Sequence, residues 1–314
     1  MTPDDSRKAF LVPSGLKIAI ILNGISLKKK FFYKKALPLL NEFKIDVFET
    51  RSEDDAFSFA SNCVVKGYDL LIAAGGDGTL NQVLNGIIQD RENKNDLPVL
   101  GVLPLGSGND FARALKISRN AKELRERIKS FQVRNLDVGK INFTKDTGTP
   151  GLSYFINVAD AGMGPEVVNR MTRNRSFGSG LAYYKAIIAT FFFYKSVTVK
   201  IKTPHWEWKN KLRTVAIGNA KFYGHGLCIA PDAKTDDGVF STFVCGDVSV
   251  LEFIRYSGTL RNSKKIIHPK VTYASARHIE ITADSPCRIE ADGELLGFLP
   301  ATIDIIPGGI KFLC

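Results

Sequence analysis

Cysteine is scarce in this sequence and shows no pairing pattern. Five cysteines are scattered over 314 residues, and no two stand at the spacing of a zinc site or a redox motif. An odd count also argues against the disulfide framework that small secreted domains use. We therefore predict a reducing, cytoplasmic location and expect the thiols to pack in the core.

Long apolar runs are also missing. The longest, from Ile187 to Tyr194, is far shorter than the roughly 20 residues needed to cross a bilayer. The first fifteen residues hold acidic side chains and lack the run of about 7–15 apolar residues found in a secretory signal. We therefore expect a soluble protein that is not exported.

Acidic residues are fewer than basic ones, 32 against 43, so the formal net charge is +11. Such a surplus attracts nucleic acid, anionic lipid headgroups or phosphorylated ligands. No nucleic-acid-binding motif accompanies it, so we expect no nucleic-acid partner. The lysines between Lys28 and Lys35 fit either a solvated helix face or a patch that meets phosphate or membrane.

The first part of the chain alternates short β-rich runs with helical patterns. Strands are expected over 17–22, 45–50, 69–74 and 99–104, and helices over 38–43, up to about 66, from 79 onward and over 111–116. Strands that alternate with helices form parallel βαβ units. This half is therefore predicted to be an α/β domain with a parallel sheet.

The second part reads as an antiparallel β-sandwich. Strands are expected over 153–159, 196–202, 214–220, 238–244, 278–283 and 287–291, interrupted by helices near 178–194 and 249–260. Residues 145–151 read as a hairpin turn and not as a linker, so we expect two tightly apposed domains. The boundaries are 1–139 and 140–303, with the tail 304–314 a candidate to return to the first domain.

A glycine-rich loop, Ala74 to Thr79, follows the third expected strand and opens a helix. Glycines allow a ligand close to the backbone, and N–H groups at a helix start favour phosphate. Asp77 would repel phosphate unless a divalent cation lies between them, which suits Mg²⁺ with ATP. The alternative is a turn capped by Asp77. The P-loop pattern GxxxxGK[ST] is absent, so its lysine is missing.

Two further loops carry carboxylates. Leu105 to Asp110 follows the strand over 99–104, at the same predicted sheet edge, and taken alone it also fits a helix-capping turn. Glu290 to Glu294 lies in the β-rich half, where a hairpin with Asp-Gly at its turn is the default interpretation.

The three loops together resemble the catalytic family of diacylglycerol kinases, whose bacterial members are related to sphingosine and ceramide kinases. The matching segments are GGDGTLNQVLNG (75–86), PLGSGNDFARAL (104–115) and EADGE (290–294), supported by NLDVGKI (135–141), FINVADAGMGPEV (155–167) and the segment 216–240. The resemblance covers nearly the whole chain from Leu16 onward. It implies an ATP-binding domain and a β-rich lipid-substrate domain, with the active site in the cleft between them.

The resemblance also implies roles for individual residues. Asp292, with Glu294 beside it, would be the base for the lipid hydroxyl. ATP contacts fall on Asn23, Ser26, Gly75, Gly76, Asp77, Gly78, Thr79, Gly106, Ser107, Gly108 and Asn109. Mg²⁺ ligands fall on Asp77, Asp110, Asp137, Asp236 and Asp237, with Asp232 a further candidate.

Some positions depart from the family pattern. The loop after the first strand reads Asn23-Gly24-Ile25-Ser26 in place of an NPxSG-like motif, Gln82 stands where Glu is frequent, and His225 replaces a common glycine. These changes leave the local shape of the cleft open, and we interpret His225 as a packing or surface residue.

We therefore expect an ATP- and Mg²⁺-dependent lipid kinase, with conversion of diacylglycerol to phosphatidic acid as the first candidate reaction. A NAD-kinase-like enzyme with a soluble substrate and a non-catalytic nucleotide or lipid sensor are the alternatives. The expected partner is lipid substrate at an anionic membrane surface, bound peripherally. The lipid's identity and a homodimer, which family members often form, stay open.

Overall fold

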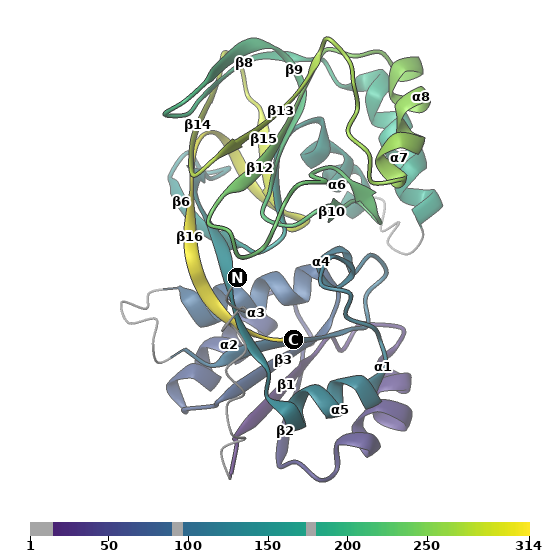
Figure 1. Ribbon diagram of the computed structural model, residues 1–314, viewed down its shortest axis with the longest axis vertical. Helices are drawn as coiled ribbons and strands as arrows, with labels where there is room; N and C mark the ends of the chain where they lie inside the picture. The colour runs from purple at the N-terminus through teal and green to yellow at the C-terminus, as the bar shows by residue number, and fades with distance from the viewer. Residues whose placement is uncertain (1–14, 90–96, 174–179) are drawn as a thin grey trace, which may run out of the picture. The chain divides into compact units, whose positions relative to one another are not determined.

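The computed structural model describes residues 15–89, 97–173 and 180–314 (Figure 1). Two compact units are present: one runs to Leu136 and includes Gly308–Cys314, and the other is Asp137–Pro307. The division falls close to the boundaries expected from the sequence. The N-terminal segment, on which the expectation of no secretory signal rests, lies almost entirely outside the described residues.

The first unit is built on a parallel sheet, as predicted. Its strands are β1 (Ile18–Leu22), β2 (Ile45–Glu49), β3 (Leu70–Gly75) and β4 (Val99–Pro104). Their order is β4-β3-β1-β2, with parallel pairing throughout. The end of β16 (Glu294–Leu313) adds a further parallel pair, Phe312 with Leu100. Strands β1, β3 and β4 are buried along their whole length, as expected when helices cover both faces of a sheet.

Helices cover this sheet on both sides. Helices α2 (Asp55–Val65) and α3 (Asp77–Ile88) pack together on one face, while the other face is covered by π-helix η1 (Phe32–Ala36), 3₁₀-helix η2 (Leu37–Leu40) and α5 (Ala121–Ser130) (Figure 1). The short helices α1 (Lys29–Phe31) and α4 (Asp110–Ala114) complete the unit.

Two helix predictions in this unit need correction. The helix expected over 38–43 lies earlier, because η1 and η2 bury Phe32, Ala36 and Leu40 at four-residue spacing and end at Leu40. Helix α5 was missed, although Leu124 and Ile128 stand at helical spacing and the Asn120 side chain accepts the backbone N–H of Lys122.

The second unit is β-rich, as predicted. Its strands are β5 (Val133–Thr144, which begins in the first unit), β6 (Pro150–Phe155), β7 (Val158–Gly162), β8 (Val197–Lys202), β9 (Glu207–Gly218), β10 (Phe222–Tyr223), β11 (Leu227–Cys228), β12 (Phe240–Gly246), β13 (Val271–Ala276), β14 (His278–Ala283), β15 (Arg288–Ala291) and most of β16. Strands β5 and β6 form the hairpin predicted for residues 145–151, with Thr144 opposite Pro150.

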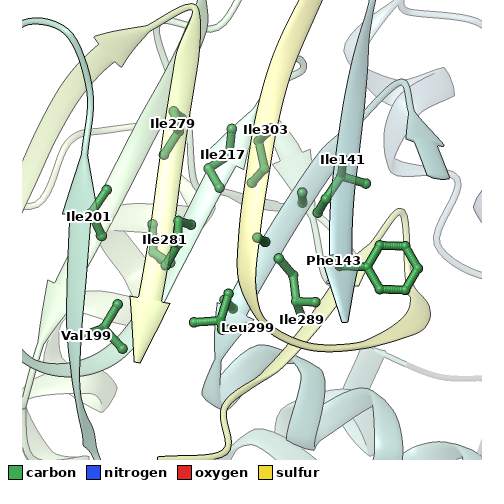
Figure 2. Close-up of a cluster of buried hydrophobic side chains, with 14 of the residues drawn as sticks. Ile141, Phe143, Val199, Ile201, Ile217, Ile279, Ile281, Ile289, Leu299 and Ile303 are labelled. Carbon is green, nitrogen blue, oxygen red and sulfur yellow. The ribbon is translucent and has the colours of Figure 1, made fainter. Parts of the chain in front are cut away.

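The antiparallel pairs of this unit close a ring. The pairs are β9–β8, β8–β14, β14–β16, β16–β15, β15–β7 and β7–β9. An apolar core fills the ring; Figure 2 shows Ile201, Ile217 and Ile303 among the side chains that converge from different strands. Period-2 patterning predicts such strands but leaves open whether their sheet closes on itself.

Three helices pack on the outer side of β9 and β12. They are α6 (Met163–Arg173), α7 (Gly180–Phe193) and α8 (Val250–Arg261). Helix α8 begins with a capping box formed by Ser249 and Glu252. Helices α7 and α8 were predicted, although the expected start of α7 near residue 178 lies outside the described residues, and α6 was missed. Within the described ranges, every helix is too short or too polar to span a bilayer.

Candidate functional site

The two glycine loops of the first unit contact each other through their backbones. The N–H groups of Leu105 and Gly106 both donate to the carbonyl of Gly75, at 2.8 and 3.0 Å. A Cβ added to Gly106 would lie 2.3 Å from the Cα of Gly76, far inside ordinary contact. The sequence predicted that both loops lie at one sheet edge, and the structure brings them together there through glycine backbone.

Asp77 fastens the first loop to the second. It is the first residue of α3, and its carboxylate accepts the backbone N–H of Asp110 at 3.1 Å and that of Phe111 at 3.2 Å. These donors belong to the first turn of α4, where backbone N–H groups have no partner within the helix. Asp77 is thus a helix-capping residue, as the alternative interpretation of the sequence proposed. The helix that it caps is α4, in the second loop, and not its own helix α3.

Asn109 shapes the second loop from inside. It adopts a left-handed backbone conformation, φ 55° and ψ 47°, which asparagine tolerates better than most residues. Its side chain accepts the N–H of Gly106 and donates to the carbonyl of the same residue, both at 2.9 Å. These two bonds hold Gly106 against the first loop.

Asn23 and Ser26 lie at the same edge, in the loop after β1. The Asn23 side chain donates to the Thr79 hydroxyl at 3.3 Å and accepts the N–H of Ile25 at 3.1 Å. The Ser26 hydroxyl accepts the N–H of Lys28 at 3.2 Å. The missing NPxSG-like motif thus leaves a loop that still contacts α3 through Asn23.

Two cations stand beside the glycine loops. Lys28 Nζ donates to the carbonyl oxygen of Gly106 at 2.7 Å, and Arg119 Nη2 donates to the same oxygen at 3.1 Å. Burial, followed by the charge of Arg119, lowers the pKa of Lys28. Lys28 was considered only as part of a lysine cluster, and Arg119 carried no sequence signal because its position depends on the loop between α4 and α5.

The predicted metal ligands fall into two groups. Asp77 and Asp110 lie together in the first unit. In the second unit, Asp137 accepts the N–H of Gly238 at 2.6 Å, and Asp237 accepts the N–H of Val239 at 3.2 Å. Asp137 thereby holds the loop that contains Asp236, while Asp232 pairs with Lys265. Across the residues that the structure describes, no set of three or more His, Cys, Asp or Glu side chains is arranged as a metal site.

Asp292 sits in the turn between β15 and β16. It has φ 53° and Gly293 has φ 88°, the positive values of the Asp-Gly hairpin expected from the sequence. The buried Asp292 carboxylate accepts three backbone N–H groups at 3.0 Å, those of Ile156, Asn157 and Val158. Asp292 therefore ties the β15–β16 turn to the β6–β7 segment. Glu294, half-buried, begins β16.

Two buried acids were given no role by the sequence analysis. Asp160 of β7 and Glu290 of β15 are register partners and are both buried. Burial raises the pKa of Asp160 to about 8, although hydrogen bonds from Thr214 and Tyr223 oppose the shift. Burial, followed by the charge of Asp160, raises the pKa of Glu290 well above its ordinary value. Their neighbours along β7 and β15 belong to the apolar core that fills the ring, so alternation along these strands would place both acids on an exposed face.

An apolar cavity lies beneath the three helices of the second unit. Its volume is about 60 Å³. Side chains of α7 and α8 form much of its wall, namely Tyr183, Ile187, Phe191, Phe253, Tyr256 and Leu260. The Tyr183 ring also packs against His225, with centroids 5.2 Å apart, in line with a packing role for this histidine.

Comparisons with known proteins match both units. Residues 17–141 match the diacylglycerol kinase catalytic domain, and residues 157–314 match the YegS C-terminal NAD kinase beta sandwich-like domain. A diacylglycerol kinase from Staphylococcus haemolyticus is 30% identical over 90% of this chain and 83% of its own length. A diacylglycerol kinase from Staphylococcus epidermidis is 31% identical over 90% of this chain and 87% of its own length. The chain belongs to the diacylglycerol kinase family.

The fold of this family member also matches a solved structure. The crystal structure of a diacylglycerol kinase from Bacillus anthracis str. Sterne superposes with a TM-score of 0.69, covering 95% of this chain and 96% of that one at 22% identity. The two-domain architecture, catalytic domain followed by a β-sandwich-like domain, is thus shared. As a diacylglycerol kinase family member, the protein is a phosphotransferase that acts on a hydroxyl acceptor.

Proposed function

We propose that this kinase uses ATP with Mg²⁺ to phosphorylate the hydroxyl of a lipid, with diacylglycerol as the first candidate substrate and phosphatidic acid as its product. The relatives named above are diacylglycerol kinases. The observation that carries the proposal is the convergence of Lys28 and Arg119 on the Gly106 carbonyl, where the two glycine loops meet. Two cations at one loop junction favour a phosphate ligand.

The phosphates of ATP would lie against the first turn of α3 and the two cations. Backbone N–H groups at a helix start attract anions. Lys28 and Arg119 converge on one carbonyl oxygen, which compensates two positive charges poorly. A phosphate group would neutralise them, and together they would supply what the lysine of a P-loop supplies elsewhere.

Mg²⁺ would be held mainly by the nucleotide. This ion keeps several water ligands and usually binds one or two carboxylates together with substrate phosphates. Asp77 and Asp110 are suitable carboxylates beside the proposed phosphate site, and they would orient the waters of the ion. When bound, Mg²⁺ would offset the charge of the phosphates. Asp137, Asp236 and Asp237 stay candidates for a second, structural site.

Asp292 would remove the proton of the lipid hydroxyl as the phosphoryl group transfers. Its three backbone hydrogen bonds would fix the orientation of the carboxylate, as a positioned base requires. Glu294 is the second candidate. Because Asp292 and the glycine loops belong to different units, the expectation that the reaction takes place between them stays a prediction.

The cavity beneath α6, α7 and α8 would take part of the lipid's acyl chain. Its wall is almost entirely apolar, as is usual for such pockets. Its volume is about 60 Å³, so only a short part of a chain would fit in it as it stands.

Transfer of label from γ-labelled ATP tests the proposal directly. The panel comprises diacylglycerol, monoacylglycerol, phosphatidylglycerol, ceramide and sphingosine in mixed micelles with Mg²⁺, with NAD as the soluble acceptor. Label in one lipid would support the proposal and identify the substrate. Label in NAD alone would replace it with a soluble-substrate kinase, and ATP binding without label in any acceptor would favour a sensor.

A further inference from the structure

The outer sides of α7 and α8 expose large apolar side chains. Twelve such side chains are exposed in the described residues. Five of them lie on these helices and a sixth, Ile267, lies in the loop after α8; they are Leu181, Phe192, Phe193, Leu251, Ile254 and Ile267, with exposed fractions from 46% to 91%. Single exposed apolar residues are ordinary, but a group on two neighbouring helices marks an interaction surface. We call these six residues the α7–α8 face.

The two helices form one continuous surface. The Phe253 ring of α8 packs against Phe191 and Tyr184 of α7, with centroids 4.9 and 6.1 Å apart. The outward stripe of α7 follows helical spacing, since Leu181, Lys185 and Phe192 lie four and seven residues apart and all are exposed. The inward residues of the same helices line the apolar cavity, so the face lies over the space proposed for the acyl chain.

Positive charge surrounds the α7–α8 face. Residues 180–195 and 250–270 contain one acid, Glu252, which caps α8 and contacts His268. The same ranges contain seven cations: Lys185, Lys195, Arg255, Arg261, Lys264, Lys265 and Lys270. Of these, Lys265 pairs with Asp232, so the excess of positive charge rests on the other six. The guanidinium of Arg170 also lies 5.2 Å from the Phe193 ring centroid.

Apolar side chains surrounded by positive charge favour some binding partners of the α7–α8 face over others. A second copy packed face to face would bring two cationic rims together, because a two-fold interface repeats the same patch on both subunits. An anionic bilayer satisfies both features, since apolar side chains enter the acyl region while lysine and arginine meet headgroup phosphates.

We propose that the α7–α8 face docks this kinase on an anionic phospholipid bilayer, with Phe192 and Leu251 inserted and Lys185 and Arg255 at the headgroups. The inference rests on the proposed lipid kinase function, because docking there would deliver lipid to the cavity beneath the same helices. It adds the site and orientation of membrane contact.

Vesicle co-sedimentation tests the docking surface. The wild-type protein, the double variant Phe192→Ser/Leu251→Ser and the control Val65→Ser, which changes a 74% exposed side chain on α2, are mixed with vesicles. These contain phosphatidylcholine alone or with about one third phosphatidylglycerol. We expect wild type and control to prefer anionic vesicles, and the double variant to bind them about tenfold or more weakly, because two large apolar side chains no longer enter the bilayer.

Three outcomes would overturn the docking surface. They are unchanged vesicle binding by the double variant, equal wild-type binding to neutral and anionic vesicles, and a change of oligomeric state in the double variant without a change in vesicle binding. Kinase assays separate this inference from the proposed function. Vesicle binding through this face without phosphorylation of any lipid would refute only the function, whereas lipid phosphorylation with unchanged binding of the double variant would refute only the docking surface.

Discussion

The Asp77 carboxylate accepts the backbone N–H of Asp110 at 3.1 Å, so the first residue of α3 caps the start of α4. This bond, with its companion to Phe111 at 3.2 Å, joins the two glycine loops at the edge of the parallel sheet. Asp77, which is proposed to bind Mg²⁺ or its waters, therefore also holds the loop that carries Asp110. Experiments on Asp77 must measure folding and nucleotide binding separately.

Asp77→Asn should weaken both folding and nucleotide binding. The amide nitrogen cannot accept a backbone N–H, so one of the two bonds is lost, and the free energy of unfolding should fall by about 1–3 kcal/mol. Affinity for ATP with Mg²⁺ should fall as well. Denaturant unfolding and ATP titration measure the two effects. Asp54→Asn, at an exposed residue with no side-chain capping bond, is the matched control; an Asp77 variant no weaker than this control would contradict the prediction.

Gly106→Ala should separate the glycine loops. Its Cβ would lie 2.3 Å from the Cα of Gly76, and backbone on both sides leaves little room to relax. We expect ATP binding to be lost while the second unit stays folded, measured by ATP titration and circular dichroism. Gly258→Ala meets nothing within 4 Å inside α8, so it should keep ATP binding and stabilise its helix by up to ~1 kcal/mol. Normal ATP affinity in Gly106→Ala would refute a phosphate site at this contact.

Arg119→Gln should raise the KM for ATP more than it lowers kcat. Loss of a charge-assisted contact to phosphate costs about 1.5–3 kcal/mol, which is roughly tenfold or more in affinity. Steady-state kinetics over a range of ATP concentrations measure the split. Lys122→Gln, which removes an exposed cation from α5, should leave KM unchanged. Equal kinetics in the two variants would remove Arg119 from the proposed site.

Asp292→Asn should keep ATP and Mg²⁺ binding but lose turnover. Asparagine tolerates the left-handed backbone, and its Oδ1 can still accept the N–H groups of Asn157 and Val158. The amide nitrogen cannot accept the N–H of Ile156, so the free energy of unfolding should fall by about 1–3 kcal/mol. The value of kcat should fall about 10²–10⁴-fold without a general base. Thermal unfolding and kcat are measured on the same preparation. Full turnover would make Asp292 a turn residue only.

Asp160→Asn should change how stability depends on pH. Burial raises the pKa of Asp160 to about 8, against roughly 4 in the unfolded chain. Between these values the folded state binds more protons than the unfolded state, so wild-type stability falls as pH rises, by up to ~1.4 kcal/mol per unit. An amide has no proton to lose. Between pH 5 and pH 8, the free energy of unfolding, measured with urea, should fall more in the wild type than in the variant. Equal changes in the two proteins would contradict the prediction.

Many features of the fold followed from local pattern. Short apolar runs separated by helical segments predicted β1 to β4 and a parallel sheet, because such strands need helices on both faces. Their order in the sheet was not predicted. Helix α5 could also have been found, since Leu124 and Ile128 keep helical spacing after the capping residue Asn120. The misplaced helix before β2 has another cause: packing of Phe32 and Leu40 against the sheet outweighed the local signals around Pro38.

The sequence by itself determined the candidates for phosphate and Mg²⁺ binding, because glycine loops with Asp77 and Asp110 offer backbone N–H groups and carboxylates close together. Only tertiary structure decided what those residues contact. The two cations on the Gly106 carbonyl, the three backbone N–H groups on Asp292 and the buried pair of Asp160 and Glu290 join segments far apart in the chain. Such contacts depend on which strands pair and which loops approach one another, and the local periodicity of the sequence predicts neither.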